Sequence, residues 1–410
     1  MQTQSTNTGM HSNTRSTASP ARIAALWFGV QLVWGAVLGI SLQARCADLG
    51  GVTSLAIFGA ISTSGACAAA IAQLIVGPIS DRMRRAGRGR GAFYAIGAVL
   101  AVIALVAFYA ADNVPKLFVA FVLLQLAMNV AIGPYQAIVP DTLAPQRYGA
   151  GSGWLAAMAG AGNAIGAVLA AALGTTPLLG AVLAIALLSS AAVTLAHLRG
   201  LQLQPLSSAA PVAYSRTLVD LFISRAFVYL GFYTMLDYLY FFVATLLPAH
   251  FWLDATRASG IVILVFTLVS AAGAALAAGP ADRIDERVVV SAGGAFLVCA
   301  LALLGIAHAL LALAAAIVLA GIGWGVFLCA DWAFACRLLP PSALATVMAI
   351  WNLAVVGPQM LAPLVATLLL SRLGTLATAI GPREALLLAG AEILIGTLWI
   401  WRLPLGRGGK

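Results

Sequence analysis

Charged residues are scarce in this sequence. Asp, Glu, Lys and Arg make up 9% of the 410 residues, whereas a soluble domain carries about 25%. Hydrophobic residues account for 62% of the chain, and the mean hydropathy is +1.00. No soluble fold can bury so much apolar side-chain area, so we expect a membrane protein.

Catalytic and metal-binding motifs are also absent. The sequence has no HExxH, GxSxG or P-loop pattern and no paired histidines. Its five cysteines lack CxxC or CxxH spacing, and we interpret them as buried apolar thiols. We therefore expect no enzyme activity, no catalytic residues, no metal and no cofactor.

The first 22 residues are polar and rich in Ser, Thr and Asn, which predicts a disordered tail. The apolar run that follows, 23–44, is longer than the 7 to 15 residues of a signal-peptide core. It also ends without a small-x-small cleavage site. We expect it to remain as the first membrane span.

Twelve apolar runs have few interior charges and lengths near the roughly 20 residues that cross a bilayer. They cover residues 23–44, 52–76, 92–111, 117–139, 151–173, 178–196, 227–247, 260–278, 288–307, 310–330, 345–370 and 385–400. We predict an all-α membrane protein with twelve transmembrane helices in two pseudo-symmetric six-helix bundles. The predicted bundles span 23–197 and 223–404, joined by a linker at 198–222 and followed by a tail at 405–410.

Basic residues are distributed unevenly between the two sides of this arrangement. With both termini in the cytoplasm, 17 of the 22 Lys and Arg residues lie on the cytoplasmic side, as the positive-inside rule requires. An odd number of spans would place the basic C-terminal segment on the outer side and weaken this bias. We therefore predict a multi-pass protein of the inner (cytoplasmic) membrane, whose positive charge reports orientation and not a nucleic-acid partner.

Short motifs recur in corresponding places of the two halves. GPISDR at 77–82 recurs as GPADR at 279–283, in each case directly after the second span of its half. Gly133 and Asp141 recur as Gly323 and Asp331 with the same separation. Such repeats indicate an internal duplication, which many secondary transporters contain.

The first of these motifs resembles a signature of the major facilitator superfamily, G-x-x-x-D-R-x-G-R-R. Gly77, Asp81, Arg82 and Arg85 match it, while Arg84 stands in place of the second Gly. Segments 30–43, 133–141 and 350–363 further resemble sucrose/proton symporters and the wider glycoside/pentoside/hexuronide group. The resemblance implies alternating access around a central cavity, with the third, sixth, ninth and twelfth spans outside it.

Two acids lie inside predicted spans, where a charge is costly. We predict that Asp237, midway along the seventh span, couples proton movement to substrate binding, because Tyr229, Tyr233 and Tyr240 share its helical face. An aromatic packing stripe is the alternative. For Glu392, in the twelfth span, packing against a neighbouring helix is favoured over a coupling role. No Lys, Arg or His is expected in the middle of a span.

Amide and aromatic side chains recur in the spans expected to line the cavity. Aromatic rings can cover the apolar face of a sugar, while amides and a carboxylate bond its hydroxyls. Hydrogen bonding between helices is the alternative role for the amides. The predicted substrate-binding residues are Gln31, Trp34, Gln125, Asn129, Tyr233, Asp237, Trp324, Trp351, Asn352 and Gln359.

Charges at the cytoplasmic ends of the spans predict an inward gate. It comprises Gly77, Asp81, Arg82, Arg85, Asp141, Asp282, Arg283 and Asp331. We expect Asp141 to pair with Arg147, and Asp331 with Arg337. Topological anchoring of the arginines and solvation of helix ends are the alternatives.

Together these features predict a secondary active transporter, specifically a sugar/proton symporter. Its expected partners are a small solute, protons and the lipid bilayer, and we expect it to act as a monomer. Proton-driven efflux of an amphipathic drug or metabolite is the alternative. A non-transporting multipass membrane protein is the remote one.

Overall fold

The computed structural model describes residues 18–50, 54–201, 216–246, 255–306, 308–338, 344–373 and 382–404. The described residues are almost entirely helical. Most of the predicted N-terminal tail and the whole predicted C-terminal tail lie outside them. In chain order the elements are α1 (Pro20–Ala36), the π-helix η1 (Val37–Ser41), α2 (Leu42–Gly50), α3 (Ser54–Arg85), α4 (Gly91–Ala110), α5 (Val114–Tyr135), α6 (Ile138–Thr142), the 3₁₀-helix η3 (Pro145–Arg147), α7 (Tyr148–Leu173), α8 (Pro177–Arg199), α9 (Arg216–Leu246), α10 (Ala255–Arg283), α11 (Glu286–Ile306), α12 (Leu310–Leu338), α13 (Leu344–Leu373), α14 (Pro382–Trp399) and the 3₁₀-helix η5 (Ile400–Arg402).

Within the described residues, 11 helical stretches are long and apolar enough to cross a bilayer. The first of them runs from α1 through η1 into α2. Helix α13 has 30 residues and packs against α9 and α3, so it occupies the place of the remaining span. The predicted all-α fold of twelve membrane helices is confirmed.

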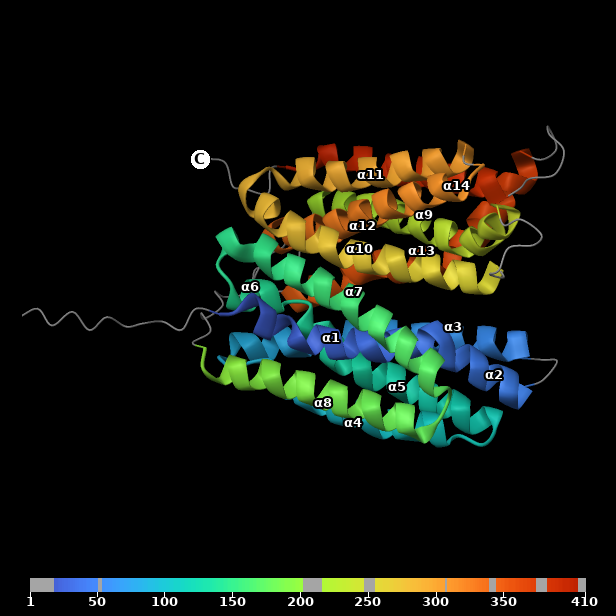
Figure 1. The fold of residues 1–410 in the computed structure, drawn as a ribbon. Helices are drawn as coiled ribbons and strands as arrows, with labels where there is room; N and C mark the ends of the chain where they lie inside the picture. Colours follow the sequence, from blue (N-terminus) through green and yellow to red (C-terminus); the bar gives the residue numbers. More distant parts are fainter. Residues whose placement is uncertain are drawn as a thin grey trace, which may run out of the picture.

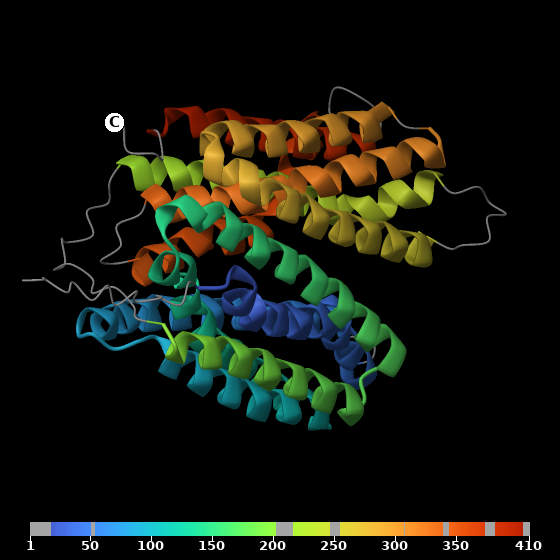
Figure 2. The same ribbon diagram turned by 60° about the vertical axis from the view of Figure 1, so that its left-hand side comes forward.

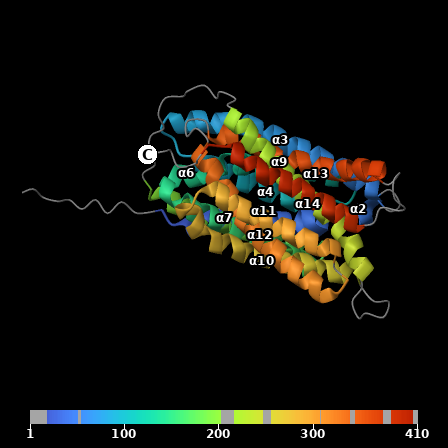
Figure 3. The ribbon, with the colours of Figure 1, turned by 90° about the horizontal axis from the view of Figure 1, so that it is seen from above.

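The helices form two bundles, α1–α8 and α9–α14, which lie one above the other in Figures 1 and 2. Two sets of helices join the bundles: α7 packs on α10 and α12, and α3 packs on α13. From above, these contacts lie along opposite long sides of the molecule (Figure 3). Any movement between the two halves therefore changes both contacts.

The turn after α3 explains how the chain tolerates Arg84 where the superfamily signature has glycine. Arg84 stays within α3, and the chain reverses at Gly87, whose φ is 77°. The amide of Gly87 donates to the carbonyl of Arg84 (3.1 Å). A left-handed backbone conformation favours glycine, so the turn forms at Gly87, three residues after position 84, where the signature has its second glycine.

Helix α9 begins at Arg216, well before residue 227, where the sequence predicts the seventh span. It extends into the predicted linker, of which residues 202–215 lie outside the described part. Arg225 consequently lies inside the helix and is 3% exposed. The prediction that no basic residue occupies the interior of a span is wrong at this position.

Close packing of α1 against α7 depends on Gly166. A Cβ atom at Gly166 would lie 2.1 Å from the carbonyl oxygen of Leu32 and 2.9 Å from the amide of Ala36. We expect Gly166→Val to destabilise the protein by about 1–3 kcal/mol through overpacking, seen as a lower midpoint of thermal unfolding in detergent. Gly260→Ala is the control, because its Cβ would meet open space. Equal midpoints for both variants would contradict this role of Gly166.

Candidate functional site

Polar side chains gather at the end of the bundle where α3 and α10 terminate, which we call the basic end. It lies at the left in Figure 1, beside α6. Both ends of the described chain lie there as well: Arg147 donates to the carbonyl of Ala18 (3.3 Å), and Arg287 donates to the carbonyl of Leu403 (3.1 Å). This agrees with an even number of spans.

Asp81, near the end of α3, bridges to α13 in the other half. Its Oδ2 accepts hydrogen bonds from the backbone amide of Thr346 (2.8 Å) and from the Thr346 hydroxyl (2.6 Å). Thr346 lies in the first turn of α13, where backbone amides have no partner within the helix. The carboxylate therefore satisfies a free donor and also interacts favourably with the positive end of the helix dipole.

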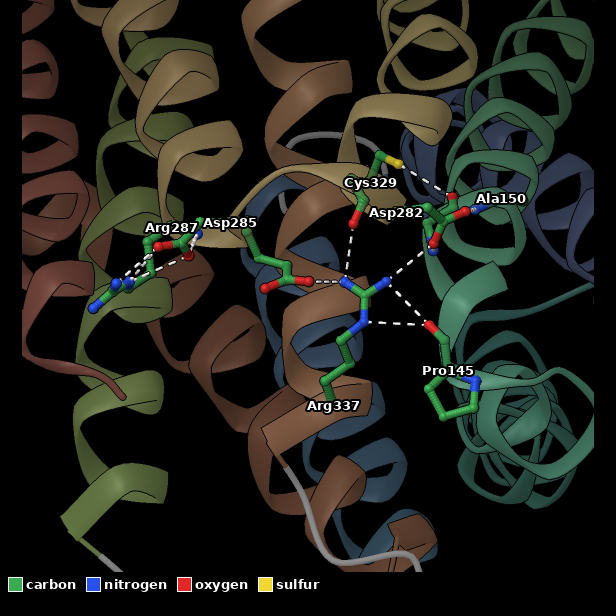
Figure 4. Close-up of polar contacts among 10 residues, drawn as sticks. Pro145, Ala150, Asp282, Asp285, Arg287, Cys329 and Arg337 are labelled. Carbon is green, nitrogen blue, oxygen red and sulfur yellow. Dashed lines mark hydrogen bonds and ion pairs between the residues drawn. The ribbon is translucent and has the colours of Figure 1, made fainter. Parts of the chain in front are cut away.

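Asp282, the repeat counterpart of Asp81, makes the corresponding contact from α10 to α7. Its two oxygens accept from the amides of Gly149 (2.5 Å) and Ala150 (2.9 Å), in the first turn of α7. Figure 4 shows this contact beside Arg337. Each half thus uses an acid after its second span to cap the fifth span of the other half, and we call these two contacts the clasps.

Buried Arg90 supports the first clasp. It donates to Asp81 (2.8 Å), to Asp141 (2.6 Å) and to the Ser80 hydroxyl (2.5 Å). Burial opposes its charge, but Asp141 and Asp81 outweigh that effect and raise the pKa of Arg90 above its ordinary value. Asp141 pairs with Arg90 and, at 3.6 Å, with Arg84. The predicted pair with Arg147 is wrong, because the Arg147 guanidinium reaches Ala18.

Arg337 supports the second clasp. It donates to Asp282 (3.0 Å), to buried Glu286, and to the carbonyl of Pro145 in the other half (3.1 Å), as Figure 4 shows for the labelled residues. The prediction that Arg337 pairs with Asp331 is wrong. Arg90, Glu286 and Thr346 belong to this region but were not among the predicted gate residues.

The other predicted gate residues divide by exposure. Gly77 is buried within α3 next to Pro78, whereas Arg82, Arg85 and Arg283 are exposed at helix ends. Exposed arginines at helix C-termini suit the helix dipole and the membrane surface. The structure therefore brings two acids of the predicted gate, Asp81 and Asp282, into bonds between the halves and leaves these three arginines at the surface.

Asp331 forms a buried ion pair with Arg225 of α9. The guanidinium carbon of Arg225 lies 3.4 Å from the centre of a Trp351 ring, and Arg225 also donates to the Tyr229 hydroxyl (3.2 Å). The early start of α9 is what carries Arg225 inward to this position. The seventh span predicted from the sequence begins at residue 227, after Arg225, so this pair was not predicted.

An amide network joins the halves in the interior. The side-chain amide of Gln73 donates to Asn129 (2.6 Å), while its oxygen accepts from Asn352 of the other half (3.2 Å) and from Gln136 (3.5 Å). Asn129 in turn donates to the carbonyl of Gln125 (2.8 Å). Gln73 was not predicted, because it stands alone within an apolar run.

Tryptophan rings also join the two halves. Trp332 contacts Trp351 (ring centres 5.3 Å apart) and Trp27 of the other half (6.0 Å). Trp324 stacks on Phe232 at 3.8 Å. The predicted binding residue Trp351 thus belongs to an aromatic layer that reaches across both halves through Trp332 and Trp27, whereas Trp324 packs against rings of its own half. Trp332 was missed, since nothing in the sequence distinguishes it from a core tryptophan.

The remaining predicted binding residues are more dispersed. Gln31 accepts from the side chain of Asn163 (3.1 Å), which joins α1 to α7. Trp34 and Tyr233 are half-buried on α1 and α9, and Gln359 is exposed on α13. The structure therefore groups part of the predicted set and leaves Gln359 exposed.

The two intramembrane acids have contrasting surroundings. Asp237 is exposed on α9, about 18 Å along the helix from Arg225 by the 1.5 Å rise per residue. The side chain of Tyr240 lies outside the described part. Glu392 is 4% exposed on α14, and among the described residues neither of its oxygens has a hydrogen-bond partner.

Two helical bundles joined by corresponding polar contacts, with polar and aromatic side chains between them, are typical of membrane transport proteins. The model of the Major Facilitator Superfamily matches residues 23–363. The chain belongs to the Major Facilitator Superfamily. The predicted resemblance at the level of the superfamily is confirmed.

Solved structures with the same fold transport different solutes. The human organic anion transporter MFSD10 (TETRAN) matches with a TM-score of 0.72 and 15% identity, over 93% of this chain and 98% of that chain. A bacterial homologue of the iron transporter ferroportin in an outward-facing state matches with a TM-score of 0.67 and 15% identity, over 93% of this chain and 98% of that chain. The proton:xylose symporter XylE, bound to 6-bromo-6-deoxy-D-glucose, matches with a TM-score of 0.69 and 13% identity, over 94% of this chain and 95% of that chain. No curated protein sequence matches the chain.

Proposed function

We propose that the chain is a sugar/proton symporter whose two bundles, 23–197 and 223–404, alternate access to a solute site between them. The clasps are the observation that carries this proposal. Asp81 and Asp282 reach across to the first turns of α13 and α7 at the same end of the molecule. Such contacts stabilise a conformation closed at the basic end, and their rupture allows the halves to move.

The basic end faces the cytoplasm in this proposal, so the conformation is outward-facing. The excess of Lys and Arg on that side supports the orientation. The protein then resides in the inner membrane with both termini cytoplasmic, and works as a monomer in the bilayer. Asp81, Asp282 and the acids and arginines around them form the cytoplasmic gate.

The amide network and the tryptophan layer support a polyhydroxylated solute. Gln73, Asn129 and Asn352 offer donors and acceptors from both halves, and neighbouring rings can stack on a sugar ring. Movement of the halves would separate Gln73 from Asn352. A solute bound between them would therefore respond to the same movement that opens the gate.

Asp237 is the proposed proton carrier. It is the predicted acid on α9 whose side chain is exposed, whereas Glu392 is buried on α14, and the proposal requires that water and solute reach Asp237. We assign Glu392 a secondary role in coupling or in helix packing. A carboxyl that gains and loses a proton in step with solute binding would couple the two movements.

Uptake into proteoliposomes across a panel of sugars, with and without an inward proton gradient, tests the proposal. We expect Asp237→Asn to lower gradient-driven accumulation at least about tenfold while leaving counterflow intact, because the neutral amide carries no proton. Asp112→Asn, an exposed acid paired with Lys116, is the matched control. Unchanged accumulation in the Asp237 variant would end its assignment as the carrier.

Proton-driven efflux of an amphipathic solute is the second candidate, favoured by the layer of tryptophan rings that includes Trp27, Trp332 and Trp351. Counterflow of labelled sugar and efflux of a dye, both measured in the same vesicles, separate the two functions. Sugar counterflow without dye efflux supports a sugar transporter, and the reverse supports efflux.

A further inference from the structure

Arg225 is a buried charged residue to which the proposed function assigns no role. It is 3% exposed within the seventh span, between Asp331 of α12 and the ring of Trp351 on α13. A guanidinium is always charged and offers five N–H donors. A charge held at this depth is costly to keep, which makes a structural role alone a poor explanation.

Three buried N–H donors in this cluster have no acceptor among the described residues: Nε of Arg225, Nε1 of Trp332 and Nε1 of Trp351. The three side chains are in contact, since Arg225 lies on the Trp351 ring and Trp351 packs against Trp332. Buried donors normally have hydrogen-bond partners, because a buried donor without a hydrogen bond costs free energy. A group with several acceptor lone pairs would satisfy them together.

The cluster lies where the two halves meet. Trp332 is in contact with Trp27 of α1, and the second clasp joins the same helix α12 to its neighbours through Arg337. Opening of the basic end would separate Trp27 from Trp332 and uncover the donors. A ligand at this position would therefore be exposed by the conformational change that transport requires.

We propose that Arg225, Trp332 and Trp351 bind the carboxylate of a small organic anion, which for the proposed sugar transporter is a sugar acid and not a neutral sugar. A carboxylate matches the planar guanidinium and provides enough lone pairs for the indole donors. Asp331 neutralises Arg225 while the site is empty. Because that pair is neutral, the bound anion adds one negative charge, which a cotransported proton cancels. This inference rests on the proposed function as a proton-coupled transporter.

Tryptophan fluorescence of the full-length protein in nanodiscs tests the proposal with two matched pairs of ligands, glucuronate against glucose and benzoate against benzamide. We expect at least one carboxylate to bind about 10- to 100-fold more tightly than its neutral partner, the range for a charged hydrogen bond. The double variant Arg225→Gln/Asp331→Asn removes both charges without leaving one unpaired. It is expected to lose this preference, and a variant of an exposed arginine in η5, Arg402→Gln, is expected to keep it.

Each outcome decides a different point. Equal affinity for charged and neutral ligands, a double variant that retains the preference, or no fluorescence response to either carboxylate would overturn the role of Arg225. Sugar accumulation driven by a proton gradient could still occur in those cases, and the proposed function would survive. Conversely, tight carboxylate binding without any gradient-driven uptake would support the site and contradict proton symport.

Discussion

Substitution of Asp282 by Asn is expected to increase the alkylation rate of Cys329 by about 10- to 100-fold. The Asp282 carboxylate accepts from two amides of α7 and pairs with Arg337, and a hydrogen bond to a charged group is worth about 1.5–3 kcal/mol. Loss of that amount shifts the balance toward a conformation open at the basic end. Arg337 keeps Glu286 as a partner, so the variant should still fold.

Cys329 is a natural reporter of this movement. It is buried, and its thiol lies 3.5 Å from the carbonyl of Gly149 in the other half. The measurement uses a membrane-permeant maleimide, with the other four cysteines replaced by Ser. Asp81→Asn should act in the same direction through the first clasp. Asp285→Asn, whose partner Arg287 is in the same half, is the control, and an increase of equal size there would contradict the gating role.

Substitution of Arg90 by Gln is expected to lower the free energy of unfolding by about 3–5 kcal/mol, the usual cost of removing one partner from a buried ion pair. Arg90 holds two acids, Asp81 and Asp141, whose side chains are 1% and 7% exposed. Without it, both carboxylates must be desolvated with weaker compensation. Chemical denaturation in detergent micelles measures the effect.

Arg88→Gln provides the matched comparison, because Arg88 lies in the same turn but is exposed. Its substitution should change stability by no more than about 0.5 kcal/mol. If the Arg90 and Arg88 variants unfold together, the ion pairs of Arg90 contribute little to the stability of the bundle.

Hydropathy and repeated motifs predicted the architecture because both are properties of neighbouring residues. A span is a continuous apolar run, and the recurrence of the segment around Asp81 as the segment around Asp282 is visible in the letters alone. The same recurrence singled out the two acids that form the clasps.

Ion-pair partners were predicted wrongly where they depend on how distant helices pack. Asp331 was matched with the nearby Arg337, yet its partner Arg225 comes from a helix more than a hundred positions away in the chain. The error followed from the start of α9, since a helix beginning at Arg216 carries Arg225 inward. Gln73, Glu286 and Thr346 were missed for a related reason. Each gains its meaning from a contact with a distant helix.

The residues whose amides form the clasps differ in how well they tolerate substitution. Each acid bonds to backbone amides, at Thr346 on one side and at Gly149 and Ala150 on the other. Since every residue except proline has that donor, position 150 is free to vary during evolution without loss of the backbone bond, whereas position 346 also donates a side-chain hydroxyl to Asp81. Position 149 is different, because a Cβ there would lie 2.5 Å from the carbonyl of Ala278. Homologues should therefore keep glycine at 149 and a hydroxyl residue at 346 while their residues at 150 diverge.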